Sequence, residues 1–185
     1  MKKELQTILE KDVTYSQRLR LLGENKILHP IAGFLAHSGD SWYWLAVLFV
    51  VWLFTDSTWH AISAFFAGSI LIQAFLVLGI KFLIKRSRPA GDWGAIYRNS
   101  DPNSFPSGHA TRAAMLAGLF WGMNMHPLAL ILTVWALLVS FARVILGLHY
   151  LSDIIAGWIL GTLLTFLMLG LQPMLFQMLP GVFFR

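Results

Sequence analysis

Two histidines, His109 and His149, and one aspartate, Asp153, lie together with several cations between long apolar runs of the chain. His149 and Asp153 are four residues apart, so they lie on one face if both belong to the start of a helix. A carboxylate beside an imidazole fixes its tautomer and stabilises its cation, as a nucleophilic or basic histidine requires. The pair alone is equally compatible with a structural role, so its chemistry depends on its neighbours.

The segment KFLIKRSRP, residues 81–89, places basic side chains at the end of an apolar run. If it is helical, Lys81 and Arg88 lie on one face about 10 Å apart along the axis, and Pro89 ends the helix. Basic residues at a helix end commonly anchor it at a membrane interface. Lys81, however, lies two turns inside the helix end and therefore requires an anionic partner.

A third polar segment, DPNSFPSGHATR at residues 101–112, contains Pro106, Ser107 and Gly108 just before a new apolar run. A turn that enters a helix at about His109 exposes backbone amides, which bind an anion together with the helix dipole. Ser107 adds a hydroxyl group. In the alternative interpretation, Ser107 is an ordinary helix cap and His109 an interfacial residue.

The composition indicates a membrane protein. Of the 185 residues, 57% are hydrophobic and 12% are charged, and the mean hydropathy is +0.64. Residues 61–80 carry no charge and, as a helix, match a hydrocarbon core of about 30 Å. Further spans are expected over 42–54, 109–123, 127–148 and 154–181, the last ending near Gln172 and Pro173. The segment 25–40 is either a short span or a half-buried helix.

These runs predict an all-α polytopic membrane bundle of about six transmembrane helices, or five if 25–40 does not cross. Residues 1–24 form an amphipathic helix on the membrane surface, with apolar residues at three-to-four-residue spacing: Leu5, Ile8, Leu9 and Val13. Residues 25–185 form the bundle, and 1–185 is expected to be a single domain.

Several classes of function are disfavoured. The net charge is +5, but the basic residues do not form a soluble face with interleaved aromatic residues. No nucleic acid is therefore expected as a partner. The absence of cysteine excludes disulfides and thiolate metal sites. A metal held by the two histidines and Asp153 would be crowded by cations, so no metal and no cofactor are expected. No obligate protein partner is inferred.

The three polar segments are expected to converge. Two spans separate the connection 85–108 from the turn 143–153, which puts both on the same side of the membrane. Arg143 then joins Lys81 and Arg88 around one small volume that also holds both histidines and a helix N-terminus. Such a set of fixed cations and amides suits a tetrahedral, multiply charged oxyanion such as phosphate.

The order and spacing of these residues resemble the three-part signature of the type 2 phosphatidic acid phosphatase family. The matching parts are Lys81 with Arg88-Pro89, then Pro106 to His109, then Arg143 with His149 and Asp153. The resemblance covers residues 81–153. One position departs from it, because the family often has serine where this chain has Ala142, at the cost of at most one supporting hydrogen bond.

The resemblance implies a metal-independent phosphatase in which His149 attacks phosphorus and Asp153 orients its imidazole. His109 would protonate the leaving oxygen and later activate water. The phosphoryl oxygens would be held by the remaining signature residues, Lys81, Arg88, Ser107, Gly108 and Arg143. We expect His149 to be an exposed imidazole at a site open to water.

The leading hypothesis is hydrolysis of a phosphate or pyrophosphate monoester on a lipid, with undecaprenyl pyrophosphate, phosphatidylglycerol phosphate, phosphatidic acid and lipid A phosphates as candidates. Alternatives are a lipid phosphotransferase that uses the same phosphohistidine, and a non-catalytic protein that binds anionic lipid or transports anions. A bacterial inner membrane is expected. Six spans and a cytoplasmic N-terminus would place the site on the outer face, whereas five spans would place it inside.

Overall fold

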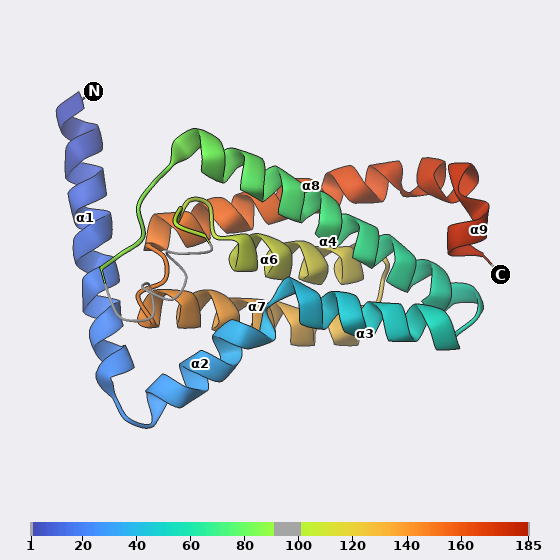
Figure 1. The fold of residues 1–185 in the computed structure, drawn as a ribbon, viewed down its shortest axis with the longest axis horizontal. Helices are drawn as coiled ribbons and strands as arrows, with labels where there is room; N and C mark the ends of the chain where they lie inside the picture. The colour runs from blue at the N-terminus through green and yellow to red at the C-terminus, as the bar shows by residue number, and fades with distance from the viewer. Residues whose placement is uncertain (1, 91–100, 185) are drawn as a thin grey trace.

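The computed structural model describes residues 2–90 and 101–184, and the described chain is a bundle of helices (Figure 1). Among these residues, extended structure is confined to one isolated bridge between Ser87 and Asn103. The helices are α1 (Lys2–Arg20), the 3-10 helix η1 (Leu21–Glu24), α2 (Leu28–Ser38), α3 (Ser41–Phe54), α4 (Ser57–Ile84), α6 (Gly108–Gly122), α7 (His126–Ile145), α8 (Leu151–Met178) and α9 (Pro180–Phe183).

The predicted all-α membrane bundle is confirmed. Three described helices are long and apolar enough to cross a membrane, namely α4 from Thr58, α7 and α8, and α3 is a shorter apolar helix. The runs predicted over 42–54, 61–80, 109–123 and 127–148 lie within or largely within α3, α4, α6 and α7. Long uninterrupted apolar runs and their Pro/Gly breakers were therefore sufficient to place these helices.

The predicted end of the last span is wrong. α8 continues through Pro173 to Met178 instead of ending at Gln172 and Pro173. Proline removes one backbone donor, but a helix that ended inside an apolar layer would expose several unpaired backbone groups. Continuing the helix therefore costs less than breaking it.

The segment 25–40, left open by the sequence, contains α2. α2 and α3 follow one another along one side of the bundle, interrupted at Gly39 and Asp40 (Figure 1). α2 packs on α7 and α3 packs on α4. This interruption places a carboxylate, Asp40, between two apolar helices.

The predicted N-terminal helix is present as α1, and it lies across the end of the bundle at which α8 begins (Figure 1). Ile8 is 63% exposed and Leu9 is 44% exposed, as expected for a face turned to lipid. On its other side, α1 caps α8: Ser16 Oγ accepts a hydrogen bond from Leu151 N at 3.0 Å. Asp12 accepts one from Ser152 N, also at 3.0 Å.

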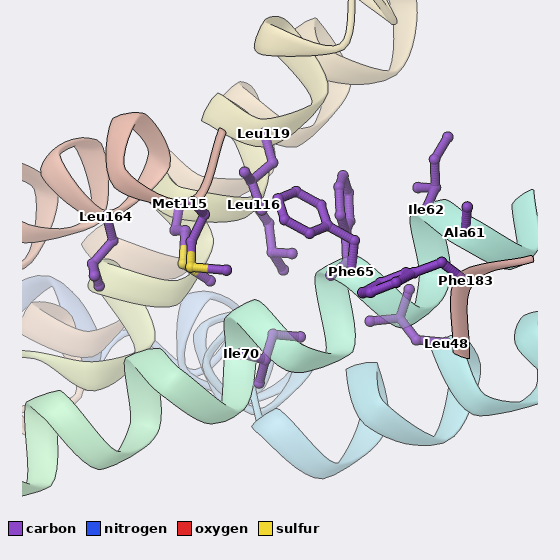
Figure 2. Packing of buried hydrophobic residues seen from close by; sticks show 12 residues of the cluster. Leu48, Ala61, Ile62, Phe65, Ile70, Met115, Leu116, Leu119, Leu164 and Phe183 are labelled. Atoms are coloured by element: carbon purple, nitrogen blue, oxygen red, sulfur yellow. The ribbon is translucent and has the colours of Figure 1, made fainter. Parts of the chain in front are cut away.

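The largest apolar cluster joins α4 to α6, with contributions from α3, α8 and α9 (Figure 2). Its labelled members are Leu48, Ala61, Ile62, Phe65, Ile70, Met115, Leu116, Leu119, Leu164 and Phe183. Because these side chains interdigitate, α6 is held against the helix that carries Lys81.

Two glycines of α8, Gly157 and Gly161, have no side chain and therefore allow α8 to pack closely against α6. A Cβ on Gly161 would meet the carbonyl oxygen of Thr111 and lie 2.9 Å from the Cβ of Ala114. One turn earlier, a Cβ on Gly157 would lie 2.9 Å from the carbonyl oxygen of Ser107. This Gly-x-x-x-Gly pair is a familiar packing signal between membrane helices. The close approach fixes the start of α6 against the second and third turns of α8.

Candidate active site

A cavity of about 360 Å³ lies where α4 and α7 end and where α6 begins. Six of the eight predicted site residues line it: Lys81, Arg88, Gly108, His109, Arg143 and His149. The other two, Ser107 and Asp153, are fully buried and joined by a hydrogen bond of 3.1 Å from Ser107 N to Asp153 O. The structure therefore brings the three polar segments together.

His149 is held between Arg88 and Asp153. Its Nε2 lies 3.2 Å from Nη1 of Arg88, and its Nδ1 lies 3.4 Å from Oδ2 of Asp153. Because a guanidinium can only donate, Nε2 must be the accepting nitrogen, and the ring proton therefore resides on Nδ1 beside the carboxylate. This tautomer leaves the lone pair of Nε2 directed at the cations of the cavity.

The prediction of an exposed imidazole is wrong, because His149 is only 1% exposed. Burial lowers the pKa of His149 to about 3; the adjacent carboxylate of Asp153 opposes this shift, and the charges of Arg143 and Arg88 add to it. The imidazole is consequently neutral near pH 7. A neutral imidazole has the unprotonated nitrogen that a nucleophile needs, and here its lone pair accepts a hydrogen bond from Arg88.

Lys81 and Arg88 meet, but not as neighbours on one helix. α4 ends at Ile84, and Lys85 takes a left-handed conformation with φ of 51°, so the predicted continuation of the helix to Pro89 is wrong. Lys81 Nζ lies 2.5 Å and Arg88 Nη2 lies 2.7 Å from the same Oδ2 atom of Asp101. Asp101 is the anionic partner that Lys81 requires, and it marks where an anion sits between the two cations.

The first turn of α6 has the expected form. Ser107 caps the helix, and its Oγ accepts a hydrogen bond from Ala110 N at 3.4 Å. Gly108 lines the cavity beside Val77, whose Cγ1 would lie 3.5 Å from an added Cβ. Arg143, 1% exposed, faces the same cavity from the end of α7. Helix amides and fixed cations thus surround one volume.

Arg86 is a further contributor, to which the sequence analysis assigned no role. Its Nη1 donates to Oδ1 of Asp153 at 2.7 Å, and its Nη2 donates to Oδ2 of Asp12 at 2.7 Å. Its guanidinium also stacks 4.1 Å above the ring centre of Tyr150. The carboxylate behind His149 is therefore tied, through Arg86, to the N-terminal helix.

Three acidic residues of this region were missed by the sequence analysis: Asp12, Asp40 and Asp101. Each is distant in sequence from its partner, so no helical or strand periodicity links them. Asp101 could have been predicted near the site, because it is the first residue of the polar segment 101–112, which also contains Pro106 to His109. Asp12 and Asp40 gave no comparable signal.

Comparison with known proteins decides the family. A family model of the PAP2 superfamily matches residues 62–177, which is more than half of the chain. This chain belongs to the PAP2 superfamily. The match includes every predicted site residue, and it confirms the resemblance to the type 2 phosphatidic acid phosphatases.

Named relatives of this superfamily member are phosphatases. The chain is 27% identical to an undecaprenyl-diphosphatase of Sulfolobus acidocaldarius over 169 residues, covering 88% of this chain and 81% of the relative. It is 29% identical over 158 residues to phosphatidylglycerophosphatase B of Bacillus subtilis, covering 77% and 74%. It is 40% identical over 101 residues to a decaprenylphosphoryl-5-phosphoribose phosphatase of Mycobacterium tuberculosis, covering 51% and 52%.

The fold is also shared with a solved structure. The crystal structure described as the first transmembrane PAP2 type phosphatidylglycerolphosphate phosphatase from Bacillus subtilis superposes with a TM-score of 0.74 at 24% identity, covering 91% of this chain and 87% of that one. The chain is thus an integral membrane phosphatase of the PAP2 superfamily.

Proposed function

We propose that the protein hydrolyses a phosphate or pyrophosphate monoester of a lipid through a phosphohistidine at His149, without a metal ion. The observation that carries this proposal is the placement of His149. Its accepting Nε2 faces the cavity cations, and its protonated Nδ1 faces Asp153. This is the arrangement of a nucleophile with an orienting carboxylate.

In the first step, Nε2 of His149 forms a bond to the terminal phosphorus as the bond from phosphorus to the leaving oxygen breaks. The leaving oxygen is the lipid oxygen of a phosphate monoester or the bridging oxygen of a pyrophosphate. The imidazole becomes positively charged, and the carboxylate of Asp153 stabilises that charge through Nδ1–H. Arg86 holds the other oxygen of Asp153 at 2.7 Å. The carboxylate therefore keeps its position while charge develops beside it.

His109 serves the leaving group and then the water. As general acid it gives a proton to the departing lipid oxygen, and as general base it takes a proton from the water that attacks the phosphohistidine. The bond from Nε2 to phosphorus then breaks, orthophosphate leaves, and both histidines return to their starting states. Each turnover consumes one water molecule.

Lys81, Arg88 and Arg143, with the amides at the start of α6, neutralise the phosphoryl oxygens. Phosphoryl transfer depends mainly on positioning and on charge stabilisation, which fixed cations provide. The carboxylate of Asp101 binds two of these cations, Lys81 and Arg88. An arriving phosphoryl group therefore displaces this carboxylate. A dianionic group gains more from three cations than a single carboxylate does.

A lipid substrate is supported by the walls of the cavity. Beyond Lys81 the lining includes the apolar side chains of Val77, Leu78 and Trp42. Leu78 and Trp42 are also exposed on the outer surface of the bundle, where lipid lies. A lipid tail would therefore leave the cavity beside Trp42 and Leu78. The candidates remain undecaprenyl pyrophosphate, phosphatidylglycerol phosphate, phosphatidic acid and lipid A phosphates, and relatives are named for the first two types of substrate.

The proposal is tested by phosphate release from a panel of these purified lipid phosphates in detergent micelles. We expect one or more to be hydrolysed, and we expect His149→Gln to lose at least about a thousandfold in kcat. The matched control is His126→Gln, which alters an exposed histidine at the start of α7, at the opposite end of the bundle. If His149→Gln retained a tenth of the normal activity, the mechanism would be wrong. Water labelled with 18O separates a hydrolase from a phosphotransferase, because only hydrolysis puts the label into orthophosphate.

The orientation in the membrane is tested separately. Because α1 caps α8 beside the site, the N-terminal helix and the site lie at the same end of the bundle (Figure 1). The location of the site on the outer face of a bacterial inner membrane stays a prediction. The chain has no native cysteine, so Lys11→Cys reports the site end and Thr58→Cys the opposite end. Labelling of Lys11→Cys alone by an impermeant maleimide on intact cells would support the outward site, and labelling of Thr58→Cys alone would contradict it.

A further inference from the structure

We propose that Asp40 is the positioning residue of His109: its carboxylate fixes the tautomer of the imidazole and favours its protonated form. This inference rests on the proposed function, in which His109 is the general acid and base. Asp40 lies outside the three-part signature and 69 residues before its partner.

The contact itself defines the tautomer. Nε2 of His109 lies 2.6 Å from Oδ1 of Asp40. A carboxylate only accepts hydrogen bonds, so Nε2 carries a proton and donates it. Nδ1 is then the nitrogen that exchanges a proton with a substrate oxygen. The two side chains are 15% and 19% exposed, so the hydrogen bond is partly shielded from water.

The fold presents Asp40 to His109 by interrupting the helix between α2 and α3. Arg112, one turn after His109 on α6, donates to the carbonyl oxygen of Gly39 through both Nε and Nη2. It also donates to Oγ of Ser41 at 2.6 Å. The residues on both sides of Asp40 are therefore fixed to the same helix that carries His109.

The lack of a side chain at Gly39 allows this approach. A Cβ there would lie 3.1 Å from Cδ2 of His109 and 3.0 Å from Cγ1 of Val139, both tighter than ordinary contacts. The edge of the imidazole that contains Nε2 and Cδ2 thus packs directly on the interruption. The opposite edge, which contains Nδ1, is left for the cavity that His109 lines.

The charges around His109 explain why it needs a carboxylate. Cations face it from three helices, Lys81 on α4, Arg112 on α6 and Arg143 on α7, and His149 faces it from the turn before α8. Burial of the ring, first, and each positive charge around it disfavour a protonated imidazole. Asp40 is in direct contact and opposes them, while its second oxygen lies 3.2 Å from Nδ1 of His37. A general acid in this setting requires such a counter-charge.

The test compares Asp40→Asn with wild type on two substrates, dioleoyl phosphatidic acid and p-nitrophenyl phosphate. The alkoxide of the lipid needs a proton to leave, whereas the nitrophenolate does not. For Asp40→Asn we expect kcat/KM to fall about tenfold to a hundredfold on the lipid and by less than about threefold on the aryl phosphate. The alkaline limb of the pH profile of kcat/KM on the lipid should move to lower pH. The control is Asp56→Asn, which alters an exposed carboxylate at the start of α4, at the far end of the bundle.

Two further variants separate the possible failures. His109→Ala must first lose more activity on the lipid than on the aryl phosphate. Equal loss of activity on both substrates would rule out His109 as the general acid, and this inference with it. The proposed phosphohistidine at His149 would not be affected by that result. If His109→Ala discriminates between the substrates but Asp40→Asn does not, the inference alone is overturned. Asp40→Glu retains the charge and should keep the alkaline limb at its wild-type position even if Asp40→Asn does not fold. A shifted limb in Asp40→Glu would also overturn the inference.

Discussion

Replacing Gly161 by alanine should destabilise the bundle and impair the site together. The added Cβ would meet the carbonyl oxygen of Thr111 and lie 2.9 Å from the Cβ of Ala114. Carbon atoms pack best at about 3.5–4.0 Å, so α8 and α6 must separate by roughly 0.5–1 Å. Thr111 lies one turn after Ser107, and this separation therefore displaces the amides that face the phosphoryl group.

The size of the effect follows from the packing. Overfilling a close-packed interior typically costs about 1–3 kcal/mol, which corresponds to a midpoint of thermal unfolding roughly 2–12 °C lower for a chain of this length. A displacement of about 1 Å at a reacting centre costs up to about a hundredfold in rate. Gly170→Ala is the matched control on the same helix, because nothing lies within 4 Å of its Cβ position. That change should be neutral or stabilise the helix by about 0.5–1 kcal/mol.

The assay is thermal unfolding of the detergent-solubilised variants followed by tryptophan fluorescence, with kcat measured on the best lipid substrate. Gly161→Ala should unfold below wild type and lose about tenfold or more in kcat, whereas Gly170→Ala should unfold at or slightly above the wild-type midpoint and keep the wild-type kcat. Equal midpoints for the two variants would refute the close approach of α6 and α8. A lower midpoint with unchanged kcat would refute its link to the site.

Three further outcomes are expected. Activity should survive excess EDTA because side-chain cations neutralise the phosphate, and loss that magnesium restores would contradict this. Asp12→Asn should lower kcat about tenfold, since Arg86 loses one of its two carboxylate partners and no longer holds Asp153 firmly, while the exposed Glu10→Gln on the same helix should not. His149→Gln should flatten the pH dependence of the free energy of unfolding. An unfolded histidine binds a proton below about pH 6.5, whereas folded His149 binds one only near pH 3. As the pH falls between these values, the wild-type free energy of unfolding therefore decreases by up to about 1.4 kcal/mol per pH unit. Equal slopes of the unfolding midpoint against pH in the two proteins would count against a buried neutral imidazole.

The helices could be predicted because the apolar runs are long and their breakers are chemically clear. The first turn of α6 follows from Pro106 to His109, and α4 follows from a run without charge. The convergence of the signature residues could also be predicted, because alternating spans bring every second connection to the same side. These features depend on local sequence or on simple topology.

The rest depends on tertiary contacts. α4 ends at Ile84 because Lys85 is left-handed and the residues after it, Arg86 and Ser87, pair with the segment at 103–104, which no local propensity predicts. α8 passes through Pro173 because an apolar surrounding penalises a break more than a missing donor. The pairing of Asp40 with His109 joins segments far apart in sequence, and only the packing of α2 on α7 and of α3 on α4 reveals it. In contrast, the spacing of Gly157 and Gly161 was a readable signal for helix packing.

The phosphohistidine is the central claim, and rapid acid-free quenching tests it most directly. Wild-type protein is mixed with 32P-labelled lipid phosphate, quenched in alkaline detergent within milliseconds, digested, and mapped by mass spectrometry. We predict label that is stable to alkali and labile to acid, located on His149, absent from His149→Gln and accumulated in His109→Ala with an aryl phosphate. Rapid turnover of the lipid with no labelled protein, or label on a residue other than His149, would contradict the account.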